Sequence, residues 1–137
     1  FMAFTQAIVD PGDPLNFARH AALEPLDGVA GWKPRDVLIQ EVVEDAIVPN
    51  STSEALARAT GAGIMHRVTD ASGFSDLGAS ASGNAGGATV VMCQFDTVSG
   101  KPAEHGGLIF TAEAIDQYVA FFASGLAAAP ASVKSPY

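Results

Sequence analysis

Two residues, Asp45 and His105, have the side chains and the order in the chain that acid–base chemistry at a hydroxyl group requires. A histidine can take the proton from a hydroxyl nucleophile and later return it to the leaving group. A carboxylate beside the histidine can hold the imidazole in the correct tautomer and stabilise its protonated form. His105 follows Asp45 by 60 residues, which is enough chain for a helix, a loop and a strand between them. The pair therefore indicates the acid and the base of a nucleophilic active site.

Both residues follow a predicted buried strand. Residues 36–40 are a short aliphatic run, and residues 88–95 are a second, longer one, with a weaker strand predicted over 64–68. Runs of this kind are typical of parallel strands that are covered on both faces. Because ligands of open α/β sheets bind beyond the carboxyl ends of the strands, we expect Asp45 and His105 to meet at that edge.

Helices are predicted between and after these strands. Ser51 and Glu54 have the form of a capping box, and Gly61 is a natural helix end. The last helix is expected to begin at Thr111 and to end at Gly125. Four of its apolar side chains recur at helical spacing and are expected to pack against the rest of the fold. They are Ile115, Tyr118, Val119 and Phe122.

The alternation of strands and helices predicts an α/β fold with a mostly parallel sheet flanked by helices. We expect residues 1–35 to be a cap or connector with short helices, residues 36–125 to form the α/β unit, and residues 126–137 to be a tail. Two strong strands do not make a stable sheet by themselves, so we expect residues absent from this chain to complete it. The apolar start, Phe1 to Phe4, also indicates a piece of a longer chain, produced by processing, nicking or gene splitting.

The composition of the chain excludes several classes of function. With 137 residues, of which 48% are hydrophobic and 16% charged, the chain is typical of one globular domain. Its formal net charge of −8 argues against nucleic-acid binding, since contacts to phosphates need basic side chains. No apolar run approaches the ~20 residues of a transmembrane segment. No cofactor-binding motif or metal-ligand spacing is present, and the single cysteine, Cys93, lies in an apolar run typical of a buried residue.

Several segments occur in the order found in one enzyme family. They are Asp10-Pro11-Gly12-Asp13-Pro14, then Val37-Leu38-Ile39-Gln40-x-x-x-x-Asp45-x-x-Val48-Pro49-Asn50, and later Glu104-His105-Gly106-Gly107-Leu108. Over most of residues 1–125 the chain resembles bacterial α/β-hydrolase lipases, in particular extracellular lipases of the Pla-1/cef type. The resemblance implies the C-terminal part of an α/β-hydrolase fold. It also implies a secreted or cell-envelope lipase or esterase acting on ester or lipid substrates, with Asp45 as the triad acid and His105 as the triad histidine.

The nucleophile of that family is missing from this chain. No Gly-x-Ser-x-Gly motif occurs, and the nearest segment, Gly78-Ala79-Ser80-Ala81-Ser82-Gly83, has the wrong spacing and no preceding strand. In that family the serine precedes the acid, so the serine and the oxyanion-hole donors are expected upstream of Phe1. The resemblance therefore predicts a serine carboxylic-ester hydrolase that is active only in combination with an N-terminal fragment or chain that carries the serine.

Other assignments stay open. Glu41 and Glu44 are the lesser candidates for the acid, whereas His20 and His66 suit structural positions in a helix end and a strand. A metal held by the acid and the histidine would need further ligands. The competing hypothesis is a non-catalytic α/β binding or interaction module, in which both residues are ordinary loop residues without a catalytic role.

Overall fold

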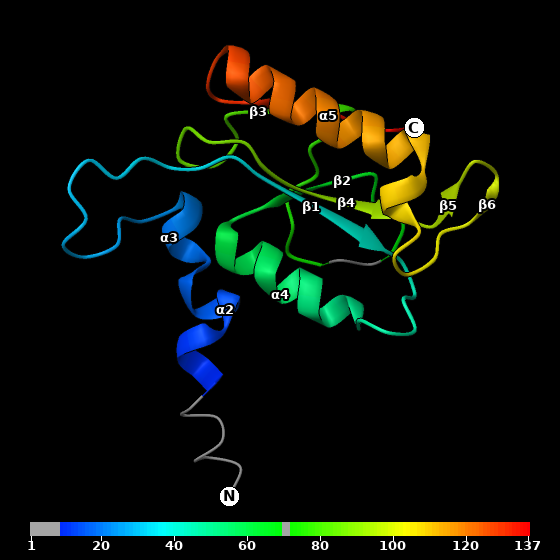
Figure 1. Ribbon diagram of the computed structural model, residues 1–137, viewed down its shortest axis with the longest axis horizontal. Helices are drawn as coiled ribbons and strands as arrows, with labels where there is room; N and C mark the ends of the chain where they lie inside the picture. Colours follow the sequence, from blue (N-terminus) through cyan, green and yellow to red (C-terminus); the bar gives the residue numbers. More distant parts are fainter. Residues whose placement is uncertain (1–8, 70–71) are drawn as a thin grey trace, which may run out of the picture.

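The computed structural model describes residues 9–69 and 72–137, so the apolar segment Phe1 to Phe4 lies outside the described residues. The fold is mixed α/β, with a small parallel sheet between helices (Figure 1). The sheet has the strand order β1 (Val37–Val42), β4 (Val90–Phe95), β2 (Gly63–Met65). Both strand pairs are parallel, as predicted from the buried aliphatic runs. The carboxyl ends of β1 and β4 therefore reach the same edge of the sheet.

The position of a strand in the sheet determines how deeply it is buried. All six residues of β4 are buried, because β4 has a paired strand on each side. In β1 only the last two residues are buried, and its first four are half-buried. Within the described part of the chain β1 pairs with β4 alone, so its other edge keeps unpaired backbone donors and acceptors.

Two helices cover opposite faces of the sheet (Figure 1). Ile39 packs in the same core cluster as Ala57 of α4 (Asn50–Thr60), whereas Leu38 packs with Phe121 of α5 (Ala112–Ala127). This alternation is the two-residue period of a strand that is covered on both faces.

The start of α4 differs from the prediction, although its end does not. The helix ends at Gly61, whose positive φ of 75° suits glycine, as predicted. The predicted capping box is not formed: α4 begins at Asn50, one residue before Ser51, and Glu54 pairs with Arg58 at 3.2 Å. The helix begins earlier because Pro49, with its restricted φ, occupies the N-cap position.

The face that α5 turns toward the sheet is not the predicted stripe. Ala114, Gln117 and Phe121 are its buried residues, while Val119 and Phe122 are 52% and 62% exposed. Polar contacts hold this face against the sheet. Gln40 Nε2 of β1 donates hydrogen bonds to the Ala114 carbonyl and to Gln117 Oε1, both at 2.9 Å. The helix also continues two residues past Gly125, to Ala127.

The remaining elements are short. Before the sheet lie a 3-10 turn and two single-turn helices, η1 (Asp10–Gly12), α2 (Pro14–Phe17) and α3 (Arg19–Ala22). Between β2 and β4 lies β3 (Ser80–Ser82), which pairs antiparallel with β7 (Ser132–Lys134) near the end of the chain. After β4 lie the antiparallel pair β5 (Thr97–Val98) and β6 (Lys101–Pro102) and then η2 (Leu108–Phe110). Part of the segment expected as a tail thus forms β7. None of the helices in residues 9–69 and 72–137 is long and apolar enough to cross a membrane.

Candidate active site

Asp45 lies in the turn that connects β1 to α4. Its Oδ1 accepts hydrogen bonds from the backbone amides of Ile47, at 2.7 Å, and Val48, at 3.1 Å. Such Asx-type bonds are a common way for aspartate to shape a turn around itself. They orient the carboxylate and leave its second oxygen, Oδ2, available to a partner.

His105 reaches this turn because a hairpin folds the preceding loop back on the sheet. The hairpin β5–β6 turns at Ser99 and Gly100, which both have positive φ. The Ala103 amide then donates to the Asp96 carbonyl at 2.8 Å, so the chain returns to the end of β4. The Ser99-Gly100 dipeptide is the sequence signal for this hairpin.

A tight turn presents the His105 side chain. The Gly107 amide donates to the Glu104 carbonyl at 2.9 Å, so His105 and Gly106 are the two central residues of the turn. Gly106 has φ of 73°, a conformation that glycine adopts without a steric penalty. Glycine at position 106 therefore suits the backbone conformation of the turn that presents His105.

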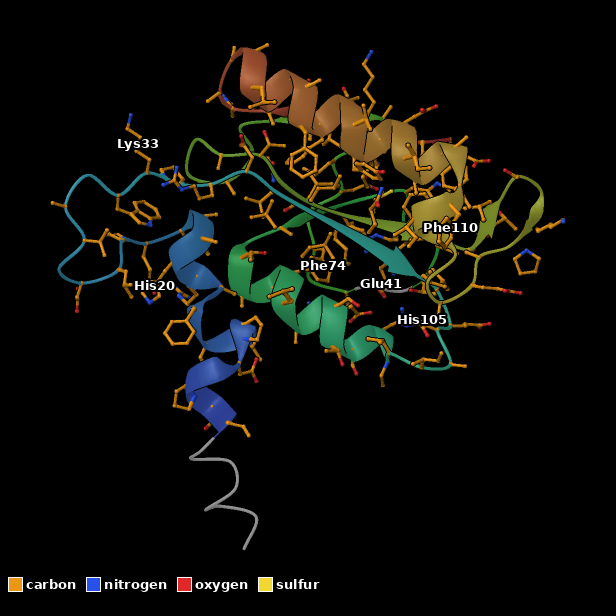
Figure 2. The ribbon with its side chains drawn as sticks, viewed as in Figure 1. His20, Lys33, Glu41, Phe74, His105 and Phe110 are labelled. Atoms are coloured by element: carbon orange, nitrogen blue, oxygen red, sulfur yellow. The ribbon has the colours of Figure 1, made fainter. Side chains whose placement is uncertain are left out.

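Asp45 and His105 form a hydrogen-bonded pair. Nδ1 of His105 lies 2.7 Å from Oδ2 of Asp45, with the Asp45 side chain 9% exposed and the His105 side chain 42% exposed. The hydrogen bond from His105, followed by that from the Ile47 amide, lowers the pKa of Asp45. An ionised carboxylate only accepts hydrogen bonds, so Nδ1 donates, and in the neutral ring Nε2 keeps its lone pair. Figure 2 shows His105 near the carboxyl end of β1.

The pair borders two small cavities. One, of about 240 Å³, is bounded by the end of β1, by Ser53 of α4 and by Leu108 and Ile109 after the histidine turn. The other, of about 340 Å³, lies between the two turns and includes Ala46 and Ala103. A proton acceptor beside a partly apolar cavity is the arrangement in which a histidine can act on a bound hydroxyl group.

The two lesser candidates for the acid form no hydrogen bond with His105. Glu44 is exposed, and Glu41 lies on the α4 face of β1, where it is 2% exposed. Neither carboxyl oxygen of Glu41 has a well-aligned hydrogen bond within the described part of the chain. Burial raises the pKa of Glu41 to about 7, against the lowering effect of the neighbouring Asn50 and Gln94. Glu41 is therefore a buried carboxyl that borders the same cavity as Asp45 and His105 without a hydrogen bond to either (Figure 2).

The other histidines and the cysteine have separate surroundings. Nδ1 of His20 lies 3.3 Å and 3.2 Å from two backbone carbonyls after α3, and the ring of His66 stacks on Tyr137 with 3.9 Å between centroids. Cys93 is fully buried, which raises the pKa of its thiol to about 11. His20 lies in α3, as expected, whereas His66 is not in the predicted strand: β2 ends at Met65, and His66 has a positive φ of 52°.

No hydroxyl group completes the pair within residues 9–69 and 72–137. Asp45 is the only hydrogen-bond partner of His105 there, and Ser82 donates instead to the Ala131 carbonyl at 3.0 Å. The same residues contain no group of three or more side chains that could hold a metal ion. The described residues thus hold a hydrogen-bonded aspartate and histidine with no hydroxyl group bonded to the ring.

Because the carboxylate of Asp45 orients the ring, neutral His105 is expected to carry its proton on Nδ1. In ¹⁵N-detected NMR of the isolated chain, Asp45→Asn should lower the Nδ1–H population, since the asparagine amide no longer requires a donor at this position. Glu44→Gln serves as the matched control and should leave the tautomer as it is. If Asp45→Asn leaves the ratio of the two His105 tautomers unchanged, the hydrogen bond does not orient the ring.

Asn50 is a residue of this site whose role sequence reasoning missed. Its side chain hydrogen-bonds to both ends of the segment that leads into the acid turn, at Val42 and at Glu44. A polar residue directly after proline at the start of a helix was the available signal, but it does not distinguish this role from a solvent-exposed cap.

Comparisons with protein-family models, with curated proteins and with solved structures found no match to this chain.

Proposed function

We propose that this chain supplies the acid and the histidine of a serine carboxylic-ester hydrolase, a lipase or esterase. The observation that carries the proposal is the 2.7 Å contact between His105 Nδ1 and Asp45 Oδ2 beyond the carboxyl ends of two parallel strands. Asp45 would orient the ring. Nε2 of His105 would take the proton of a serine hydroxyl during attack on the ester carbonyl and return it to the leaving alcohol. In the second half of the reaction, Nε2 would take a proton from water and return it to the serine as the acid is released.

In this proposal the serine and the oxyanion-hole donors come from a second polypeptide or from a longer form of this chain. Three features favour a partner beside β1. The outer edge of β1 is unpaired within the described residues. Cavities of about 540 and 400 Å³ flank the strand, one lined by Leu15 and Leu56 on the α4 side and one by Phe122 on the α5 side. A neighbouring strand with its helices would cover both, as the C-terminal part of an α/β-hydrolase sheet requires.

The test is to isolate this chain with the polypeptide that binds it and to label the complex with a fluorophosphonate, which reacts with activated serines. We expect one labelled serine outside residues 1–137, on the second polypeptide or on the longer form of this chain. His105→Ala should abolish that labelling, because the serine then loses its base.

Two other results would contradict the proposal in different ways. A label on Ser53, which borders the same cavity as His105, would place the nucleophile in this chain. Absence of any labelled serine in the complex would favour the non-catalytic binding module instead. Ser53→Ala is the matched variant, and we expect it to leave the labelling of the partner unchanged.

A further inference from the structure

The side chain of Asn50 connects the turn that carries Asp45 to the end of β1, beyond the point where the Val43 amide donates to the Phe95 carbonyl of β4 at 2.9 Å. Nδ2 of Asn50 donates to the carbonyl of Val42, the last residue of β1, at 2.6 Å. Its Oδ1 accepts from the amide of Glu44 at 2.9 Å. One amide group therefore connects the first residue of α4 both to the end of the strand and to the residue immediately before Asp45.

One of the two hydrogen bonds of Asn50 is made to a residue with a strained backbone conformation. Glu44 has a positive φ of 57°, which a residue with a Cβ adopts only at an energetic cost. The bond from the Glu44 amide to Asn50 offsets part of that cost and fixes the direction in which the chain enters Asp45. The bonds that Asp45 accepts from Ile47 and Val48 are internal to the turn, so they orient the carboxylate without fixing the turn on the sheet.

We propose that Asn50 is a positioning residue that sets Oδ2 of Asp45 at hydrogen-bonding distance from His105. It acts through the acid and contacts neither the imidazole nor a substrate. Its consequence for catalysis rests on the proposed function, whereas its effect on the pair is a property of this chain alone. Asparagine suits the position because one planar group offers both a donor and an acceptor. Aspartate keeps only the acceptor, and alanine keeps neither.

The isolated chain tests this with the tautomer of His105 as the readout, measured by ¹⁵N-detected NMR. We expect Asn50→Ala to lower the ratio of Nδ1–H to Nε2–H tautomer by about tenfold, the equivalent of one weakened hydrogen bond. Asn50→Asp should lower it less, because the bond from the Glu44 amide remains. Ser51→Ala is the matched control at the neighbouring exposed position, and it should not change the ratio.

A double-mutant cycle separates action through Asp45 from a general loosening of the fold. In an Asp45→Asn background, Asn50→Ala should leave the tautomer ratio unchanged, because the group it positions is already gone. An equal change in both backgrounds would overturn the proposal, and so would an unchanged ratio in folded Asn50→Ala. Should Asn50→Ala fail to fold, the same cycle with Asn50→Asp decides in the same way. These measurements need no serine or ester, so their outcome is independent of the labelling result that tests the proposed function.

Discussion

His105→Ala is expected to lower the ester turnover of the complex by a factor on the order of 10⁴ to 10⁶, the range seen when the base of a serine triad is removed. The loss is large because Nε2 would serve every proton transfer in both halves of the reaction. Asp45→Asn should cost about 10⁴, since the ring remains but its proton moves to the wrong nitrogen. The measurement is kcat for a p-nitrophenyl ester, with the complex that contains the serine-bearing polypeptide.

Two matched variants make this result specific to the pair. Glu44→Gln changes the carboxyl next to Asp45, and His20→Gln changes a histidine that bonds only to backbone carbonyls after α3. Both should keep the turnover of the unmodified complex. Full activity in His105→Ala would remove the histidine from the mechanism, and a comparable loss in Glu44→Gln would transfer the acid role to that residue.

Glu41→Gln is expected to stabilise the chain at neutral and alkaline pH and to have little effect near pH 4. Glu41 is buried and lacks a well-aligned hydrogen bond, and its pKa is raised from an ordinary value of 4.5 to about 7. The folded state therefore binds the proton more tightly than the unfolded state does. Below pH 4.5 the Glu41 carboxyl is protonated in both the folded and the unfolded state, so its ionisation does not change the free energy of unfolding.

The expected change follows from the size of that shift. As the pH rises from 4.5 to 7, the unfolded chain releases this proton first, so folding becomes less favourable. Above pH 7 the cost is constant, of the order of 3 kcal/mol at about 1.4 kcal/mol for each pKa unit. Glutamine cannot ionise, so Glu41→Gln does not lose this free energy of unfolding as the pH rises.

Urea unfolding of the two proteins at pH 4 and pH 8 measures this effect. The difference in their free energies of unfolding should grow between the two pH values in favour of Glu41→Gln. Glu44→Gln, at an exposed carboxyl of the following turn, provides the control. A constant difference across the pH range would mean that Glu41 ionises as it does in the unfolded chain.

Much of the fold and the identity of the pair could be predicted from local sequence. The aliphatic runs of β1 and β4 predict buried parallel strands because hydrophobic periodicity is a property of a few consecutive residues. Gly61 and Gly106 mark a helix end and a turn because only certain backbone conformations favour glycine. The order of Asp45 and His105 after these strands was sufficient to expect them at one edge of the sheet.

Tertiary structure decided which groups meet and which face each element presents. Glu41, Glu44 and Asp45 are all carboxyls close together in the sequence, and in the folded chain Asp45 is the one whose Oδ2 lies 2.7 Å from His105 Nδ1. The buried face of α5 was likewise set by Gln40 of a distant strand, against the apolar stripe of the helix itself. Such choices depend on the direction of a few hydrogen bonds between residues up to 77 positions apart. Local periodicity carries no information about those directions, because each one arises only when the strands and helices have packed.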